Sequence, residues 1–418
     1  MKTMFPCLVS VVALLSAVPA RSADREKTPQ EIENLAEELV RKLGNPDYHE
    51  REAASKELAK LGLGALKAIQ EGLDNPVPEI AYRCESLYPK IRRLDLKRRI
   101  EVLAADQEGR IANTLPLGVT YEKICGKDEN ARKFYIELCK NNLQLLDDAD
   151  NDPKTTGKAY VDFFNGIEKR GNGVSPAETE GAALLLAALL LIGADEKIGP
   201  SIDEANRNQP KSDRTYQRMI GVLWTPKHSV AVNNAKNGRY LRKLMFAWAK
   251  RLPEPLAITS FTFFIRDMIK KHPTKQLSDP DTLEYLMDLA ISTTSQRIHQ
   301  KGEAMSMVAE ASISESDRVA FFEEKLFKDE TKLNLSDVNG LTKFRVETRA
   351  CDYALAVCVK LSGQSFKDYG FDILGSHSDM FSWRYSGFAK DETRKAAFKK
   401  YEEWRKANPI KKDEPKQD

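Results

Sequence analysis

The chain has few of the residues that build disulfide-rich domains. Its 418 residues include only 6 cysteines, and the five that follow the leader are too sparse and odd in number for a disulfide framework. Cys351 and Cys358 share a predicted helix, where their α-carbons would lie about 10 Å apart, too far to bridge. Cys125 and Cys139 flank a turn and a helix and could pair. The alternative is burial of all five as small apolar residues: Cys84, Cys125, Cys139, Cys351 and Cys358.

An excess of charge of one sign and a membrane-length apolar run are also missing. The 65 basic residues nearly cancel the 62 acidic ones, which leaves a formal net charge of +3. This balance predicts no strong long-range attraction to nucleic acid or anionic membranes. The apolar run from Ala182 to Ile192 is shorter than the ~20 residues of a spanning helix, so it predicts a core helix.

Two segments resemble metal-binding motifs, and each lacks a required ligand. The segment His49–Ala53 begins like a zinc-protease motif but ends in alanine where the second histidine would stand. Pro153 and Ala159 occupy the glycine and bidentate glutamate positions of a would-be calcium loop. Three aspartates alternate at the start of that loop: Asp148, Asp150 and Asp152. An acidic, solvated turn is the favoured interpretation.

Motifs for nucleophilic or phosphate chemistry are incomplete as well. The segment Gly363–Lys367 begins like a nucleophile elbow but has neither the closing glycine nor a preceding strand. A glycine-rich phosphate-binding loop is missing from the sequence. The sequence therefore assigns no catalytic residue, no metal ligand and no cofactor.

The N-terminus has the three parts of a secretion signal. Lys2 gives a positive start, Met4–Val18 is mostly apolar, and Val18-Pro19-Ala20 offers a cleavage site. The sequence predicts a signal peptide over residues 1–20, alternatively 1–23, and a mature chain that begins at Arg21 or Asp24. We therefore expect a periplasmic or secreted protein without a transmembrane segment in its mature chain.

Directly behind this leader, a helix-pair pattern occurs twice at a period of thirty residues. Turn residues in Leu43–Asp47 align with those in Leu73–Val77. Ala54, Leu58 and Leu61 then align with Cys84, Tyr88 and Ile91. Such a period with helical apolar spacing predicts stacked helix pairs, none of which can bury its apolar face alone.

The rest of the chain is predicted to be helical, apart from a short strand-like segment and a long loop near the C-terminus. The sequence predicts four regions behind the leader. They are N-terminal repeats at 24–110, an irregular helical region at 111–330, a C-terminal HEAT-like helix with a loop and a capping helix at 331–407, and a disordered tail at 408–418. Residues 331–348 have a short-period pattern that predicts a loop with a strand pair, and Gly363–Tyr385 predicts a long loop. Helices are predicted at 28–43, 129–146, 229–251, 255–271, 280–298, 302–311, 315–327, 347–361 and 391–407, with another from Ser175.

The two N-terminal copies resemble HEAT repeats of the short, thirty-residue type. Thr348–Val357 is similar to the second helix of such a repeat. With Lys360–Phe371 and the helix Ala397–Trp404, the chain resembles secreted HEAT-repeat proteins of planctomycete bacteria. This resemblance covers about a third of the chain and implies an all-α, HEAT-like α-solenoid, but no activity. Tyr82, Cys84 and Pro89 depart from the usual pattern, and Pro89 is expected to interrupt its helix.

These features favour an exported, non-catalytic scaffold for protein–protein interaction. Its binding surface would be formed by the second helices, around 48–61 and 79–94. The alternative is an enzyme with a site in the middle region or in loop 362–386, and a purely structural envelope component is a third possibility. Among the polar residues that this loop carries are Asp372, Ser376, His377 and Asp379.

A basic run in the second repeat suggests a second kind of partner. The run is either a solvated helix face or a patch that binds an anionic envelope polymer, a lipid head group or an acidic partner, while nucleic acid is not expected. Its members are Lys90, Arg92, Arg93, Lys97, Arg98 and Arg99.

At the other end, Ala397, Phe398, Tyr401 and Trp404 share one face of the last helix. A lone helix of this length is marginal in water, so we expect it to dock on the Cys351–Leu361 helix. It would then cap the end of the helical stack.

Overall fold

The computed structural model describes residues 28–105, 115–169, 179–207, 209, 214–223, 232, 237–252, 255–271, 279–292, 298–337, 345–376 and 381–409. These residues are helical apart from loops and one two-stranded sheet, so the predicted all-α class is confirmed. The chain divides between Arg98 and Arg99 into two compact units, called unit 1 and unit 2 below. The predicted leader and residues 410–418 of the tail lie outside the described residues.

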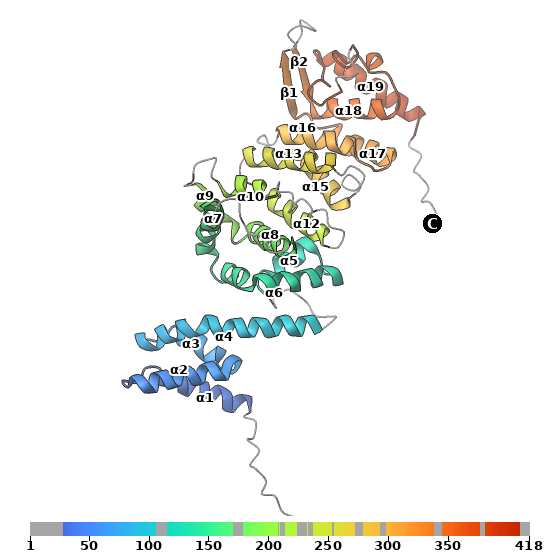
Figure 1. The fold of residues 1–418 in the computed structure, drawn as a ribbon. Helices are drawn as coiled ribbons and strands as arrows, with labels where there is room; N and C mark the ends of the chain where they lie inside the picture. Colours follow the sequence, from blue (N-terminus) through green and yellow to red (C-terminus); the bar gives the residue numbers. More distant parts are fainter. Residues whose placement is uncertain are drawn as a thin grey trace, which may run out of the picture. The chain divides into compact units, whose positions relative to one another are not determined.

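Unit 1 contains the two predicted helix pairs (Figure 1). Thr28 and Glu31 form a reciprocal cap at the start of the first helix. Each pair is joined by the same turn, because Asn45 Oδ1 accepts from the Asp47 amide at 2.9 Å and Asn75 Oδ1 from the Val77 amide at 3.0 Å. The elements are α1 (Pro29–Lys42), α2 (Tyr48–Leu61), η1 (Gly62–Ala65), α3 (Leu66–Gly72) and α4 (Pro78–Ala105), of which the part from Arg99 on belongs to unit 2.

The core of unit 1 follows the repeat register. Leu58 and Cys84 are fully buried in one apolar cluster, and Tyr88 packs against this cluster but is only partly buried. Leu58 and Tyr88 are therefore equivalent in position and unequal in burial. The expected interruption at Pro89 is wrong, because α4 continues through this residue to Ala105.

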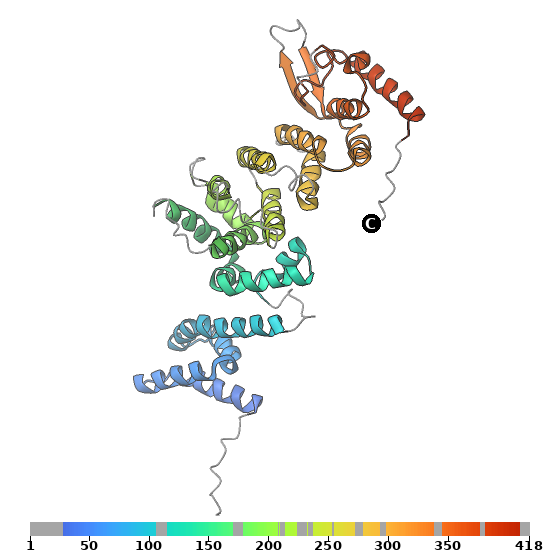
Figure 2. The same ribbon diagram turned by 45° about the vertical axis from the view of Figure 1, so that its right-hand side comes forward.

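Several of the first helices of unit 2 pack mainly against helices that do not directly follow them in the chain (Figures 1 and 2). The apolar helix α8 is the predicted core helix, and it packs against α6 and α12. The helices are α5 (Gly118–Cys125), α6 (Glu129–Asn151), α7 (Pro153–Lys169), α8 (Thr179–Ala194), α9 (Gly199–Arg207), α10 (Thr215–Leu223), α12 (Gly238–Lys250), α13 (Pro255–Lys271), α15 (Pro280–Ile291), α16 (Ile298–Ala309) and α17 (Glu315–Leu326).

Two boundaries in this region were predicted wrongly. The expected acidic turn after residue 146 is helical, since α6 runs to Asn151 and Pro153 starts α7 with its fixed φ. Asp152 accepts from the Thr155 amide at 3.2 Å and so helps to start that helix. The helix expected over 280–298 ends at Ile291, and α16 starts anew at Ile298.

The end of unit 2 contains the predicted strand pair. Strands β1 (Lys332–Asp337) and β2 (Arg345–Arg349) are antiparallel, and they stand beside the last helices (Figure 2). Because β2 extends to Arg349, helix α18 (Ala350–Leu361) begins three residues later than predicted. The segment η4 (Phe366–Tyr369) and α19 (Asp391–Ala407) complete the unit.

Helix α19 packs against α18 and η4, which agrees with the docking predicted from its apolar face. Tyr401 is the anchor, since its ring is 2% exposed and its hydroxyl donates to Glu323 Oε1 at 2.8 Å. Trp404 lies against Tyr401 at a ring distance of 5.7 Å but is only half-buried. The five cysteines among the described residues are buried, free thiols, so Cys125 and Cys139 do not pair.

Candidate functional site

The most distinctive surface of unit 1 is an exposed aromatic ring held by two arginines. Tyr48, at the first position of α2, is 56% exposed. The guanidinium carbon of Arg51 lies 5.6 Å from the ring centroid and that of Arg83 lies 6.0 Å away. These are cation–π distances, so both arginines attract the ring electrostatically. We call Tyr48, Arg51, Glu52, Glu79 and Arg83 the Tyr48 surface.

Ion pairs between the two repeats fix the arginines of this surface. Arg83 of α4 donates to Glu79 at 2.6 Å and across to Glu52 of α2 at 2.9 Å. Arg51 of α2 in turn lies 3.0 Å from Glu79 of α4. The hydrogen bonds from Arg83 lower the pKa of both glutamates, which stay charged at neutral pH. Because the carboxylates are exposed, these pairs contribute more to geometry than to stability.

The repeat turn supplies a further support. Arg51 Nη1 donates to the carbonyl of Asn45 at 2.8 Å and to that of Pro46 at 2.9 Å. The same turn positions Asp47, which caps α2 by accepting from the His49 amide at 2.8 Å. The Asn-Pro-Asp sequence thus starts the helix and anchors the guanidinium beneath Tyr48. The sequence predicted the turn but not this fixed ring, and a binding surface on the second helices stays a prediction.

Further large side chains of unit 1 are exposed on α4 and just before it. Tyr82 is 69% exposed and Val77 is 43% exposed. Binding hot spots in protein–protein interfaces are rich in tyrosine and arginine, the residue types that are found here. His49 of the incomplete zinc motif contacts Tyr48 edge to ring at 5.9 Å. The described residues contain no group of three or more histidine, cysteine or carboxylate side chains that could hold a metal ion.

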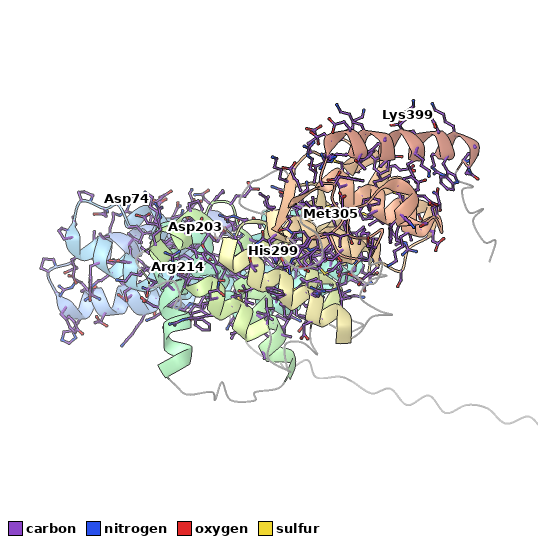
Figure 3. The ribbon with its side chains drawn as sticks, turned by 90° about the horizontal axis from the view of Figure 1, so that it is seen from above. Asp74, Asp203, Arg214, His299, Met305 and Lys399 are labelled. Atoms are coloured by element: carbon purple, nitrogen blue, oxygen red, sulfur yellow. The ribbon has the colours of Figure 1, made fainter. Side chains whose placement is uncertain are left out.

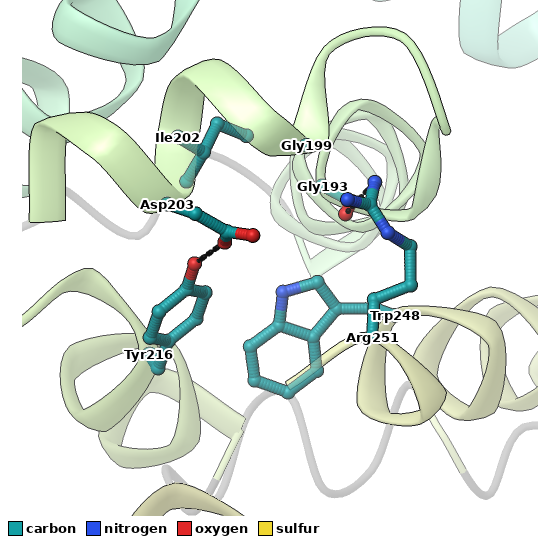
Figure 4. A pocket seen from close by; sticks show the side chains of 7 residues that line it. All are labelled: Gly193, Gly199, Ile202, Asp203, Tyr216, Trp248 and Arg251. Carbon is teal, nitrogen blue, oxygen red and sulfur yellow. Dashed lines mark hydrogen bonds between the residues drawn. The ribbon is translucent and has the colours of Figure 1, made fainter. Parts of the chain in front are cut away.

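Unit 2 has a small pocket between α8, α9, α10 and α12 (Figure 4). Tyr216 donates to Asp203 on one side, and burial raises the pKa of this tyrosine. Arg251 closes the other side by donating to the carbonyl of Asp195, and a Cβ at Gly199 would lie 1.7 Å from its guanidinium. The remaining space is about 10 Å³, room for about one water molecule. This pocket is too small for an organic substrate.

The first half of α16 is polar and yet buried. Glu303 is 5% exposed, accepts from Arg266 at 2.8 Å and from the indole of Trp383 at 3.3 Å. Lys301 is 1% exposed and donates to the carbonyl of Ser292 at 2.9 Å and to Asp329. Figure 3 labels His299 and Met305 of the same helix. No local signal in the sequence predicts this cluster, because the run His-Gln-Lys-Gly-Glu resembles a solvated helix face.

The described part of loop 362–386 does not bring its predicted polar residues together. Asp372 Oδ2 accepts a hydrogen bond from the Ala389 amide at 2.6 Å, which ties the loop to the residues just before α19. Ser376 is exposed, while His377 and Asp379 lie outside the described residues. In the would-be calcium loop, Asp148 and Asp150 are part of α6.

Comparisons with family models, with curated proteins and with solved structures find no match to this chain. Within the described ranges, no helix combines the length and the apolar character needed to cross a membrane.

Proposed function

We propose that this protein is an exported, non-catalytic helical scaffold of the HEAT-like type that binds a protein partner through the Tyr48 surface. The observation that carries the proposal is the exposed ring of Tyr48, fixed by arginines from two successive helix pairs. A ring that is already held in place loses little conformational entropy on binding, which favours affinity.

The repeat architecture supports the same proposal. In stacked helix pairs the second helix of each pair contributes to one shared binding surface. Here the second helices are α2 and α4, and the residues of the Tyr48 surface come from both. Exposed Tyr82 and Val77 extend the apolar area available to a partner. Aromatic and arginine side chains dominate the energetics of such interfaces.

Export is proposed from the leader alone. The expected mature N-terminus is Arg21 or Asp24, in the periplasm or outside the cell. N-terminal sequencing of the native protein tests this, and recovery of an intact Met1 would contradict it.

Site-specific crosslinking tests the binding surface. A photoreactive amino acid would replace Tyr48 or Tyr82, with Lys60 as the matched control, since Lys60 is an exposed residue of α2 whose partner is Glu57 on the same helix. The proposal predicts that positions 48 and 82 crosslink to the same protein in the exported fraction. Equal yields at position 60, or none at 48 and 82, would overturn it.

A further inference from the structure

Four cations on α4 lack the carboxylate partners that other cations of unit 1 have. Among the described residues, Lys90, Arg93, Lys97 and Arg98 have no ion pair. Arg92, by contrast, donates to the Tyr88 hydroxyl at 3.1 Å, and Arg99 also has a partner. The structure thus reduces the predicted basic run to four residues, which we call the α4 stripe. The cations of unit 1 that pair with glutamates are Lys42, Arg51, Lys60, Lys67 and Arg83.

The α4 stripe is linear. Lys90, Arg93 and Lys97 follow three- and four-residue spacing, so they lie along one helix face at axial steps of ~4.5 and ~6 Å. Arg98 lies beside Lys97, and Lys90, Lys97 and Arg98 are all exposed while Arg93 is half-buried. Asp95 lies within this stretch and has a partner of its own, and Glu101 follows one turn beyond Lys97. The stripe therefore presents a row of four cations that form no ion pair among the described residues.

We propose that the α4 stripe binds a linear polymer that carries phosphate groups along its length. Lysine and arginine are the side chains that bind phosphate, and a row of them matches a chain of repeated anionic groups better than a planar surface. Each cation that neutralises a phosphate also releases a bound counterion, which favours binding at low salt. The inference rests on the proposed scaffold role, because it adds a second ligand surface to the same unit.

The probe is fluorescently labelled polyphosphate, and the readout is its anisotropy with the purified full-length chain over a series of salt concentrations. The variant Lys90→Glu/Lys97→Glu should weaken binding by at least about tenfold and should lower the slope of log affinity against log salt by about two. The matched control is Arg41→Glu/Lys56→Glu, which makes the same change in net charge at two exposed residues of unit 1. This control should bind like the wild type.

Several outcomes would overturn the inference. One is that the control variant weakens polyphosphate binding as much as the α4 variant does, which would mean attraction by net charge alone. Another is that the α4 variant binds polyphosphate as tightly as the wild type. Equally tight binding of poly-glutamate or of phosphatidylglycerol vesicles would reject a phosphate-bearing polymer as the favoured ligand. A milder variant, Lys90→Ala/Lys97→Ala, keeps the test valid if charge reversal perturbs the helix, which circular dichroism would show. Failure of the crosslinking at Tyr48 would overturn the scaffold surface without affecting this measurement.

Discussion

In unit 1 the charged side chains lie at the surface around an apolar core, whereas the C-terminal segment, residues 298–409, has charged side chains in its interior. In unit 1 Leu58, Ile69 and Cys84 fill the core, and in residues 28–98 no charged residue is fully buried. In the C-terminal segment Lys301, Glu303 and Asp352 are all buried. Apolar packing tolerates substitution of similar volume, while a buried charge depends on one particular partner.

The ion pair between Asp352 and Arg394 shows this dependence most clearly. The Asp352 side chain is 0% exposed and lies 2.8 Å from Arg394, whose side chain is 8% exposed. Arg394 also donates to the carbonyl of Glu347 at 3.1 Å, so it joins α19 to α18 and β2. Unit 1 has a comparable but partly exposed pair, in which the Arg83 side chain is 14% exposed and that of Glu52 is 37% exposed.

The largest expected effect follows from this difference. Arg394→Ala should destabilise unit 2 by ~3–5 kcal/mol, because it leaves the Asp352 carboxylate buried without its partner. Arg83→Ala should cost much less, because water can solvate the exposed glutamates that it leaves. Urea unfolding of both variants gives the comparison. Equal losses would mean that burial does not distinguish the two pairs.

The next effect tests the apolar core of unit 1. Leu58 is 0% exposed, so Leu58→Ala should destabilise by ~2–5 kcal/mol through lost burial and a cavity. Tyr88→Ala, at the equivalent position of the second repeat, should cost less, because that ring is only partly buried. The denaturant midpoint is the measurement. A loss below about 0.5 kcal/mol for Leu58→Ala, typical of surface changes, would reject the repeat register.

The smallest expected effect is on how the stability of unit 2 depends on pH. Burial alone would raise the pKa of Asp329, but hydrogen bonds from Lys301 and Thr331 outweigh it and hold this pKa below its ordinary value of 3.8. A carboxyl group whose pKa is lower in the folded than in the unfolded protein stabilises the fold at pH values above its unfolded pKa. This stabilisation is lost as the pH falls through its folded pKa. Between about pH 6 and about pH 3, the wild type should therefore lose more stability than Asp329→Asn. Parallel pH profiles for the two proteins would contradict this.

The sequence predicted the periodic parts of the fold and missed the parts built by charge. The helix at 391–407 and the turns at Asn45 and Asn75 were predicted because apolar spacing and turn residues are local signals. Of the three aromatic residues predicted on one face of α19, only Tyr401 is fully buried, while Phe398 and Trp404 are half-buried, since periodicity identifies a face without ranking its residues.

The missed features depend on contacts between distant residues. Glu303 is buried because Arg266 and Trp383, far from it in sequence, provide its partners. The Tyr48 surface likewise needs Arg83, which is thirty-five positions away. A single sequence contains no local signal for such pairings, which arise only when the helices pack.

The most direct test of the scaffold is quantitative capture of partners from the exported fraction by three forms of the protein. These are the wild type, Tyr48→Ala/Tyr82→Ala, and Lys60→Ala as the matched exposed control. Since both tyrosine rings are exposed, the double variant should stay folded, with a loss of at most ~2 kcal/mol from the two cation–π contacts at Tyr48. We expect the protein that crosslinks at position 48 to be captured by the wild type and the control and to fall at least about tenfold with the double variant, the loss of a binding hot spot. Undiminished capture by a folded double variant would contradict the account.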